Sequence, residues 1–221
     1  MWFSCDKIHE PYKEPPPPPA EKTVLIEKFT GHRCSGCPSA SRVIDDLKEN
    51  YFGDKLISVA IHPGNFTSFT APTNTYNYDF RTDDGNTIAE QMNPALLPLG
   101  TVNRISDQNN NRCFGKNEWY DLINNFLYDS SGSPKLPNIE IEINNTLVNQ
   151  ELTISTTIKV LNDLEGEYRL YLFIMEDIIA PQLDGSETIE EYLHKNVYRC
   201  AVNTVYGENL ETNLISGLEI E

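Results

Sequence analysis

The 221-residue chain lacks several features that define large classes of protein. It contains no run of about 18 apolar residues, so no segment is expected to span a membrane as a helix. It also lacks an excess of basic charge, because 17 Lys and Arg stand against 33 Asp and Glu, for a net charge of −16. This charge argues against binding to nucleic acid and against docking on anionic lipid through charge. The composition suits an exposed, secreted protein.

Metal-binding motifs are also scarce. A single Cys-x-x-Cys pair is present at Cys34 and Cys37, and no second such pair or His-x-x-His pair completes a zinc site. We therefore predict no metal and no other cofactor. A complete signal peptide is missing as well, since neither a basic region nor an apolar region of the usual length precedes Cys5.

The most informative segment that is present runs from Val24 to Pro38. An apolar, strand-like stretch ends in a Gly turn, two cysteines follow, and Pro38 opens an amphipathic helix. This order is typical of the strand-to-helix redox corner of a thioredoxin-like fold. A thiol at the first turn of a helix faces unpaired backbone N–H groups, which lower its pKa. We predict Cys34 to be the more exposed, attacking thiolate and Cys37 to be the resolving thiol.

Three further residues are candidates for supporting this chemistry. Arg33 stands where thioredoxins usually carry an aromatic residue, and its cation would favour the Cys34 thiolate. His32 either stabilises the thiolate and shuttles a proton or faces solvent in the loop. Pro98 precedes a predicted strand over 101–105, and we predict a cis peptide that faces the dithiol. The alternative is an ordinary trans proline at a strand start.

Other polar residues lie near the same edge of the predicted sheet. The segment Lys55–His62 is predicted to be a central, parallel strand because its end is almost continuously apolar. We expect His62 to form hydrogen bonds within the polar insertion at 63–86. Glu27 is either a buried proton acceptor beneath the dithiol or an outward-facing strand residue, and Arg104 is placed to pair with an acidic residue.

The sequence divides into three regions. Residues 1–22 contain five consecutive prolines and are interpreted as a lipoprotein remnant followed by an extended linker. Residues 23–130 alternate strands and helices and are predicted to form the α/β thioredoxin-like domain. In residues 131–221 the hydrophobic period changes to two, which predicts an all-β, immunoglobulin-like sandwich. The strands there are too few to close a sandwich, so we expect that domain to be truncated.

The remaining cysteines have separate interpretations. Cys5 follows Trp-Phe-Ser, an apolar pair and a small residue, which is the pattern left before the lipidated cysteine of a bacterial lipoprotein. The alternative is an ordinary cysteine in an N-terminal tail. Cys113 and Cys200 are isolated in the sequence, and we expect them to be buried free thiols.

Three motifs resemble those of the Omp twenty-eight-like outer-membrane lipoproteins of Bacteroidetes. They are FTGHRCSGCP at 29–38, LPLGTVNR at 97–104 and YLHKNVYR at 192–199. The resemblance implies a lipid-anchored envelope protein with a thioredoxin-like domain and a β-rich C-terminal domain. It implies that Cys34 and Cys37 are the redox pair and that Pro98 opens the third strand.

Two functions of different classes follow from these observations. The first is thiol–disulfide exchange with protein thiols or disulfides in the bacterial envelope, with the membrane contacted only through a lipid at Cys5. The second is a surface binding or adhesion protein that recognises a surface ligand. In that case the Cys34–Cys37 pair serves only as a structural bridge in a thioredoxin-like scaffold.

Overall fold

The computed structural model describes residues 21–210 and 212–221. Its helices are α1 (Cys37–Leu47), α2 (Thr67–Thr70), α3 (Asp83–Met92) and α4 (Trp119–Leu127), with a π-helical turn over Lys48–Phe52 and a 3-10 turn over Gly53–Lys55. Its strands are β1 (Val24–Phe29), β2 (Leu56–Ile61), β3 (Leu99–Val102), β4 (Ile139–Val148), β5 (Glu151–Val160), β6 (Arg169–Leu170), β7 (Phe173–Asp184), β8 (Glu187–Ala201), β9 (Glu208–Asn209) and β10 (Glu219–Ile220).

The central sheet has the strand order β3-β1-β2-β8-β7. Strands β1 and β2 are parallel, and β2 is also parallel to β8 through the pair Ala60 and Val197. Strand β3 runs antiparallel to β1, and β7 runs antiparallel to β8. The prediction that the second strand is central and parallel is confirmed, because β2 lies between β1 and β8. A near-continuous apolar run suits a strand that is covered on both faces.

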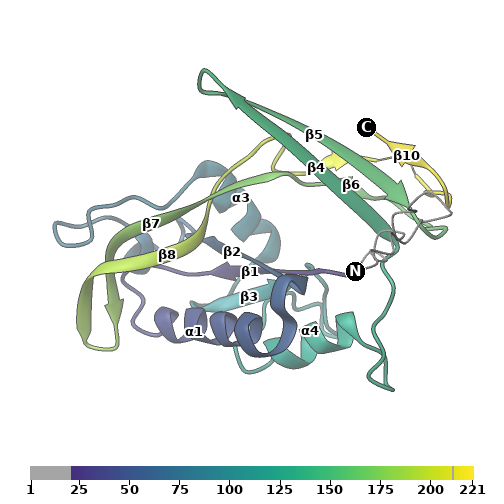
Figure 1. Cartoon of the computed structure of the whole chain (residues 1–221). Coiled ribbons are helices and arrows are strands. Elements are labelled where there is room, and N and C mark those ends of the chain that lie inside the picture. The colour runs from purple at the N-terminus through teal and green to yellow at the C-terminus, as the bar shows by residue number, and fades with distance from the viewer. Residues whose placement is uncertain (1–20, 211) are drawn as a thin grey trace, which may run out of the picture.

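Helices cover both faces of this sheet, with α1 and α4 on one side and α3 on the other (Figure 1). Alternation along β1 divides the core between these two layers. Ile26 packs with residues of α1 and α4, whereas Phe29 packs with residues of α3. Successive side chains of a strand point to opposite faces. Glu27 therefore lies on the α3 face, and Lys28 lies on the α1 face.

Two element boundaries differ from the predictions for identifiable reasons. Helix α3 begins at Asp83, inside the segment 63–86 that was predicted to be a polar insertion, because Thr82 caps it by accepting a hydrogen bond from the backbone of the first turn. Strand β3 ends at Val102 rather than at residue 105. Asn103 and Arg104 follow it with φ angles of +46° and +53°, a left-handed conformation that ends an extended strand.

The C-terminal half differs from the predicted immunoglobulin-like sandwich. Strands β7 and β8 extend the central sheet, while β4, β5 and β10 form a separate three-stranded sheet. Two residues of β8 explain this. Tyr198 is buried among residues of the first half of the chain, and Val197 pairs with Ala60 of β2 and packs in a cluster with Phe80. An alternating pattern identifies a strand, but it does not identify the sheet that the strand joins.

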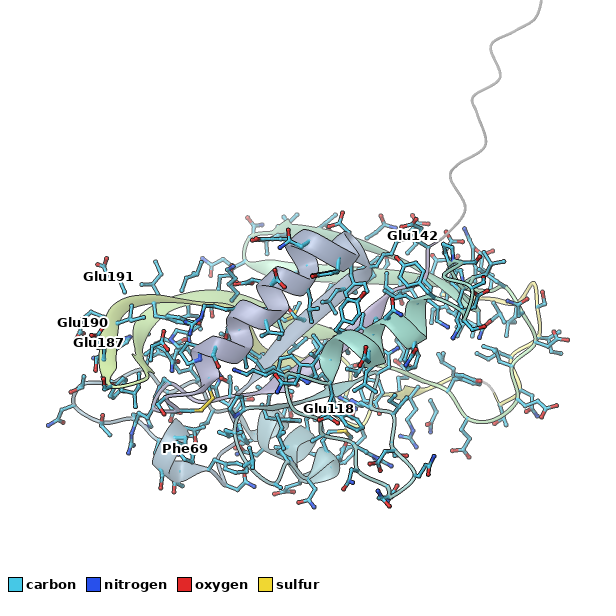
Figure 2. The ribbon with its side chains drawn as sticks, turned by 90° about the horizontal axis from the view of Figure 1, so that it is seen from below. Phe69, Glu118, Glu142, Glu187, Glu190 and Glu191 are labelled. Carbon is cyan, nitrogen blue, oxygen red and sulfur yellow. A yellow bond between two sulfur atoms is a disulfide. The ribbon has the colours of Figure 1, made fainter. Side chains whose placement is uncertain are left out.

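The surface of the molecule carries much of its acidic charge. Glu187, Glu190 and Glu191 lie at the outer end of the β7–β8 hairpin and are exposed (Figure 2). In the part of the chain that the structure describes, no helix is long and apolar enough to cross a membrane.

Candidate redox site

The Cys-x-x-Cys loop connects β1 to α1. Cys34 and Cys37 are joined by a disulfide, drawn as a yellow bond in Figure 2, with their Cα atoms 5.4 Å apart. Cys37 is the first residue of α1. Pro38 lies in the first helical turn, where a missing N–H costs no hydrogen bond. Both cysteines are buried, at 3% exposure for Cys34 and 1% for Cys37. Cys34, predicted to be the more exposed of the two, is therefore also covered in this structure.

Pro98 lies beside this loop. The Leu97–Pro98 peptide is cis, as we predicted from its position before the third strand. At Gly36, between the two cysteines, an added Cβ atom would lie 3.8 Å from Pro98 Cδ. The cis proline and the disulfide loop are thus in van der Waals reach of each other.

The β7–β8 hairpin covers the disulfide loop from the other end of the chain. The backbone N–H of Leu183 donates to the His32 carbonyl at 2.8 Å, and that of Gly185 donates to the Ser35 carbonyl at 3.0 Å. An ion pair of 2.7 Å between Arg42 of α1 and Asp184 of β7 closes the same contact. The side-chain amide of Gln182 also donates to the Cys34 carbonyl at 3.3 Å. No sequence motif predicted that the β7–β8 hairpin contacts the disulfide loop, because this contact depends on the pairing of β8 with β2.

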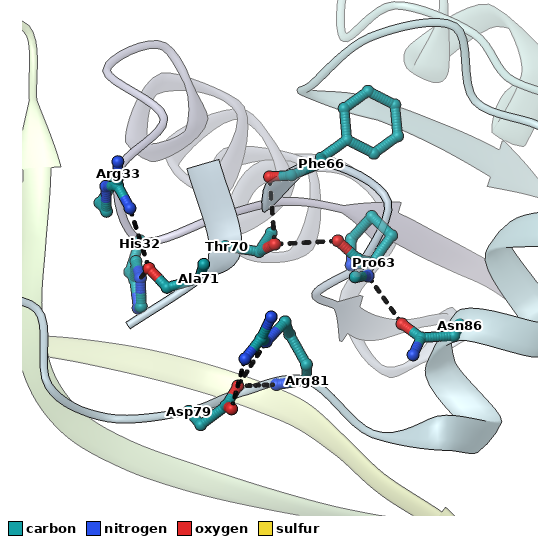
Figure 3. Close-up of polar contacts among 10 residues, drawn as sticks. His32, Arg33, Pro63, Phe66, Thr70, Ala71, Asp79, Arg81 and Asn86 are labelled. Atoms are coloured by element: carbon teal, nitrogen blue, oxygen red, sulfur yellow. Dashed lines mark hydrogen bonds and ion pairs between the residues drawn. The ribbon is translucent and has the colours of Figure 1, made fainter. Parts of the chain in front are cut away.

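His32 and Arg33 point away from the disulfide, toward the insertion at 63–86. His32 Nε2 lies 3.2 Å from the carbonyl oxygen of Ala71, and Arg33 Nη1 donates to the same oxygen at 3.0 Å (Figure 3). The solvent-facing alternative for His32 is wrong, because its side chain is fully buried. Burial lowers the pKa of His32, so the ring is neutral at pH 7. The Arg33 guanidinium is held by the insertion, which weakens its expected role beside Cys34.

The insertion is locked against the loop by its own hydrogen bonds. Thr70 Oγ1 donates to the carbonyl oxygen of Pro63 at 2.9 Å, and Asn86 Oδ1 accepts from the backbone of Gly64 at 2.6 Å (Figure 3). Gly31 is required at the contact, because a Cβ atom there would lie 2.6 Å from the carbonyl oxygen of Phe69. The insertion therefore forms one wall of the site.

Three histidines surround Phe80 next to the loop. The ring centroids of His32, His62 and His194 lie 5.5, 4.5 and 4.4 Å from that of Phe80. The hydrogen bonds expected for His62 are absent among the described residues, where both of its ring nitrogens are buried without a partner. Burial lowers the pKa of His194 to about 4 and that of His62 well below its ordinary value. The cluster is therefore neutral at pH 7.

A cavity of about 50 Å³ lies behind Cys37, on the α1 face of the sheet. Its polar lining comes from β1, α1, β2 and β8 and includes Lys28, Ser41, Ser58, His62, His194 and Asn196. Its size suffices for a few water molecules. Sequence reasoning missed Lys28, although the two charged residues Glu27 and Lys28 inside an apolar strand were a usable signal.

Glu27 occupies the opposite face of the sheet. Its carboxylate is fully buried and accepts two hydrogen bonds of 2.7 Å from Arg104, whose guanidinium also lies 4.5 Å from the ring of Tyr171. Arg104 therefore pairs with an acidic residue, as its position indicated. The bidentate pair occupies the Glu27 carboxylate, so Glu27 is buried but is not free to accept a proton from the dithiol.

The other cysteines contribute little to the site. Cys113 and Cys200 are not bonded to each other, and Cys200 is exposed rather than buried as expected. Burial raises the pKa of the Cys113 thiol to about 11, which makes it unreactive. Cys5, the predicted lipidation site, lies outside the described residues. No cluster of three or more His, Cys, Asp or Glu within 21–210 and 212–221 is arranged to hold a metal ion.

Comparison with known proteins identifies a family whose model matches this chain and solved structures with a similar fold. A family model described as outer membrane protein Omp28 matches residues 85–221, more than half of the chain. The match includes Pro98 and the β7–β8 hairpin, and it begins after the Cys-x-x-Cys loop. No curated protein matches the chain at a significant level.

Two solved structures are similar. HBP35 of Porphyromonas gingivalis aligns with a TM-score of 0.66 at 16% identity, over 90% of this chain and 63% of that chain. Protein AGR_C_4864 from Agrobacterium tumefaciens aligns with a TM-score of 0.50 at 11% identity, over 91% of this chain and 78% of that chain. The chain thus spans 63% of the length of the P. gingivalis protein. At these identities the likeness concerns the fold alone.

Proposed function

The chain belongs to the family of outer membrane protein Omp28, and from that premise we propose that it is a thioredoxin-like thiol–disulfide exchange protein of the bacterial envelope. The observation that carries the proposal is a disulfide across Cys34 and Cys37, at the corner between β1 and α1, with the cis proline Pro98 beside it. The thioredoxin-like unit would consist of residues 23–130, completed by the β7–β8 hairpin. Anchoring through a lipid at Cys5 is part of the same proposal.

The exchange would proceed through Cys34. The thiolate of a partner attacks Cys34 Sγ, the Cys34–Cys37 bond breaks, and Cys37 leaves as a thiolate. The partner is then held to Cys34 in a mixed disulfide, next to Pro98. A second thiolate of the partner attacks its own bonded sulfur, which releases Cys34 as a thiolate and leaves the partner oxidised. Since both cysteines are buried, the turn of the β7–β8 hairpin must move aside before the first attack.

Trapping of the mixed disulfide tests this proposal. In a Cys37→Ser variant the resolving thiol is missing, so Cys34 should form a stable mixed disulfide when oxidised glutathione is added. Mass spectrometry of the intact protein detects the glutathione adduct, and peptide mapping then locates it. The control is Cys34→Ser, in which buried Cys37 should remain unmodified. Modification of neither variant, or equal modification of both, would contradict an exchange reaction at Cys34.

The burial of the disulfide favours a second candidate function. A bridge at 3% and 1% exposure, covered by hydrogen bonds from the hairpin, is also what a structural staple requires. In that case the protein would be a surface binding or adhesion protein. Its disulfide would resist reduction until the whole chain unfolds, and the reduction potential of the folded protein separates this function from the first.

A further inference from the structure

Lys28 is a buried cation on the same face of the sheet as the disulfide. Its side chain belongs to β1, the residue is 7% exposed, and its ammonium group donates to the hydroxyl oxygen of Ser41 on α1 at 2.5 Å. The Ser41 hydroxyl in turn donates to the backbone carbonyl of Cys37 at 3.4 Å. The hydrogen-bond partner of Lys28 is therefore a neutral group that leads directly to the first residue of α1.

The cavity behind Cys37 provides the space between the two groups. Lys28 and Cys37 both line it, and the protein interior around it screens charge less than water does. Glu27 cannot neutralise Lys28, because it points to the opposite face and is paired with Arg104. A negative charge that develops on Cys37 would thus face a cation across a shared, low-dielectric space.

We propose that Lys28 is the counter-charge of the Cys37 thiolate and that it raises the reduction potential of the Cys34–Cys37 pair. The inference rests on the proposed exchange function for its biological meaning. In the reduction step, an external thiolate bonds to Cys34 Sγ, the electron pair of the Cys34–Cys37 bond moves to Cys37 Sγ, and the ammonium of Lys28 stabilises that thiolate. Stabilising the reduced form favours reduction of the disulfide.

The reverse step uses the same pair. With a substrate bonded to Cys34, the Cys37 thiolate attacks Cys34 Sγ and the substrate leaves as its own thiolate. Burial lowers the pKa of Lys28 from 10.5 to about 8, opposed by the charge of Asp45 on α1. A lysine in that range can also accept the proton of a Cys37 thiol near neutral pH and so become the ammonium that the thiolate needs.

Several other groups face Lys28 and bear on its charge. Asp45 of α1 is acidic but forms an ion pair of 3.1 Å with Lys195 of β8. His62, the residue after β2, and His194 of β8 line the cavity and are neutral, because burial lowers the pKa of each. Tyr192 also lines the cavity. Lys195 also lines the cavity, but it is paired with Asp45. Among the described residues, Lys28 is therefore the lysine of the lining that forms no ion pair with a carboxylate.

The pKa of Cys37 in a variant without its disulfide partner tests the proposal. In Cys34→Ala, the thiolate absorbance of Cys37 should titrate below the ordinary value of about 8.5 in spite of burial. Adding Lys28→Met should increase the pKa of Cys37 by about one unit, a tenfold loss of thiolate. In the protein with both cysteines, Lys28→Met should shift the equilibrium with dithiothreitol about tenfold toward the disulfide, or about 30 mV.

Lys116→Met is the matched control. Lys116 also donates to a serine of α1, at 2.5 Å to Ser39 Oγ, and it does not line the cavity. An equal effect of the two lysine variants would overturn the proposal, as would a Cys37 pKa above about 8.5 in Cys34→Ala. The Cys34→Ala variant can therefore overturn the proposal even if Lys28→Met does not fold. A low Cys37 pKa together with a disulfide that thiols cannot reduce would support the charge effect and contradict the exchange function.

Discussion

Glu27 and Lys28 are neighbours on β1 and lie on opposite faces of the central sheet. The charge of Glu27 has an oppositely charged partner, whereas the charge of Lys28 has a neutral one. The Glu27 carboxylate meets a guanidinium in a bidentate pair on the α3 face. The Lys28 ammonium meets a hydroxyl and a cavity on the α1 face. A buried charge is tolerated when it is paired and is costly when it is not. The ion-paired Glu27 therefore stabilises the fold, and Lys28, whose partner is a neutral hydroxyl, lies beside the disulfide.

The largest expected effect comes from breaking the satisfied pair. Arg104→Ala leaves the Glu27 carboxylate buried without its cation and should lower the free energy of unfolding by about 3–5 kcal/mol. Urea denaturation followed by circular dichroism measures it. The control is Arg81→Ala, which removes a more exposed pair with Asp79 and should cost less than about 1 kcal/mol. Similar losses in both variants would mean that the α3 face does not depend on the Glu27 pair.

The second largest effect is expected from acid, which should destabilise the protein through buried His194. The unfolded state binds protons at histidine near pH 6.5, whereas folded His194 binds one only near pH 4. The unfolded state therefore holds more protons between these values, and the free energy of unfolding falls as pH falls through that window. The loss from His194 alone should reach about 3 kcal/mol.

Denaturation curves at a series of pH values from 7 to 4 check this dependence. His194→Gln removes the titrating group and should flatten the curve. His62 and His32, whose pKa values are also lowered by burial, should retain part of the slope. An unchanged slope in the variant would show that the histidine cluster around Phe80 is not the source.

Removing the unsatisfied charge should have the opposite sign. Lys28→Met eliminates a buried ammonium and should raise the free energy of unfolding at pH 7 by about 2 kcal/mol. Because the folded pKa of about 8 lies below 10.5, the unfolded state holds more protons between those values. The stability of the natural protein should therefore rise with pH across that window, while that of the variant stays flat. Destabilisation by Lys28→Met would contradict the contrast between the two faces.

The smallest effect on the free energy of unfolding is expected in the separate sheet of β4, β5 and β10. Ile143 of β4 is 57% exposed, so Ile143→Thr should change the free energy of unfolding by less than about 0.5 kcal/mol. Ile158 of β5 is buried, and Ile158→Val should cost about 1 kcal/mol by the same denaturation assay. If the exposed substitution costs as much as the buried one, the outer face of this sheet is covered in solution.

The sequence predicted the parts of the molecule that depend on local order. The β1–loop–α1 corner and the apolar run of β2 follow from residues that are close together in the chain. The cis peptide at Pro98 was expected from the fold pattern that this corner indicates. The cover over the disulfide could not be predicted, because it depends on β8 pairing with β2 across more than a hundred residues. Cys34 and Cys37 are both buried, at 3% and 1% exposure, so whether Cys34 is the attacking thiolate stays a prediction.

The charges within β1 illustrate the same limit. Glu27 and Lys28 interrupt an apolar run, and alternation alone places them on opposite faces. Which charge finds a partner depends on Arg104, which is brought near by the left-handed turn after β3. The sequence offered Glu27 as the buried charge beneath the dithiol. In the structure Lys28, not Glu27, lines the cavity next to Cys37.

The reduction potential of the Cys34–Cys37 pair in the folded protein tests the central claim most directly. Equilibration with graded mixtures of reduced and oxidised dithiothreitol, followed by acid quenching and thiol labelling, gives the fraction reduced, and circular dichroism confirms that the protein stays folded. The account predicts a potential between about −270 and −120 mV, the range of exchange proteins. A value below about −300 mV, or reduction only on unfolding, would contradict it.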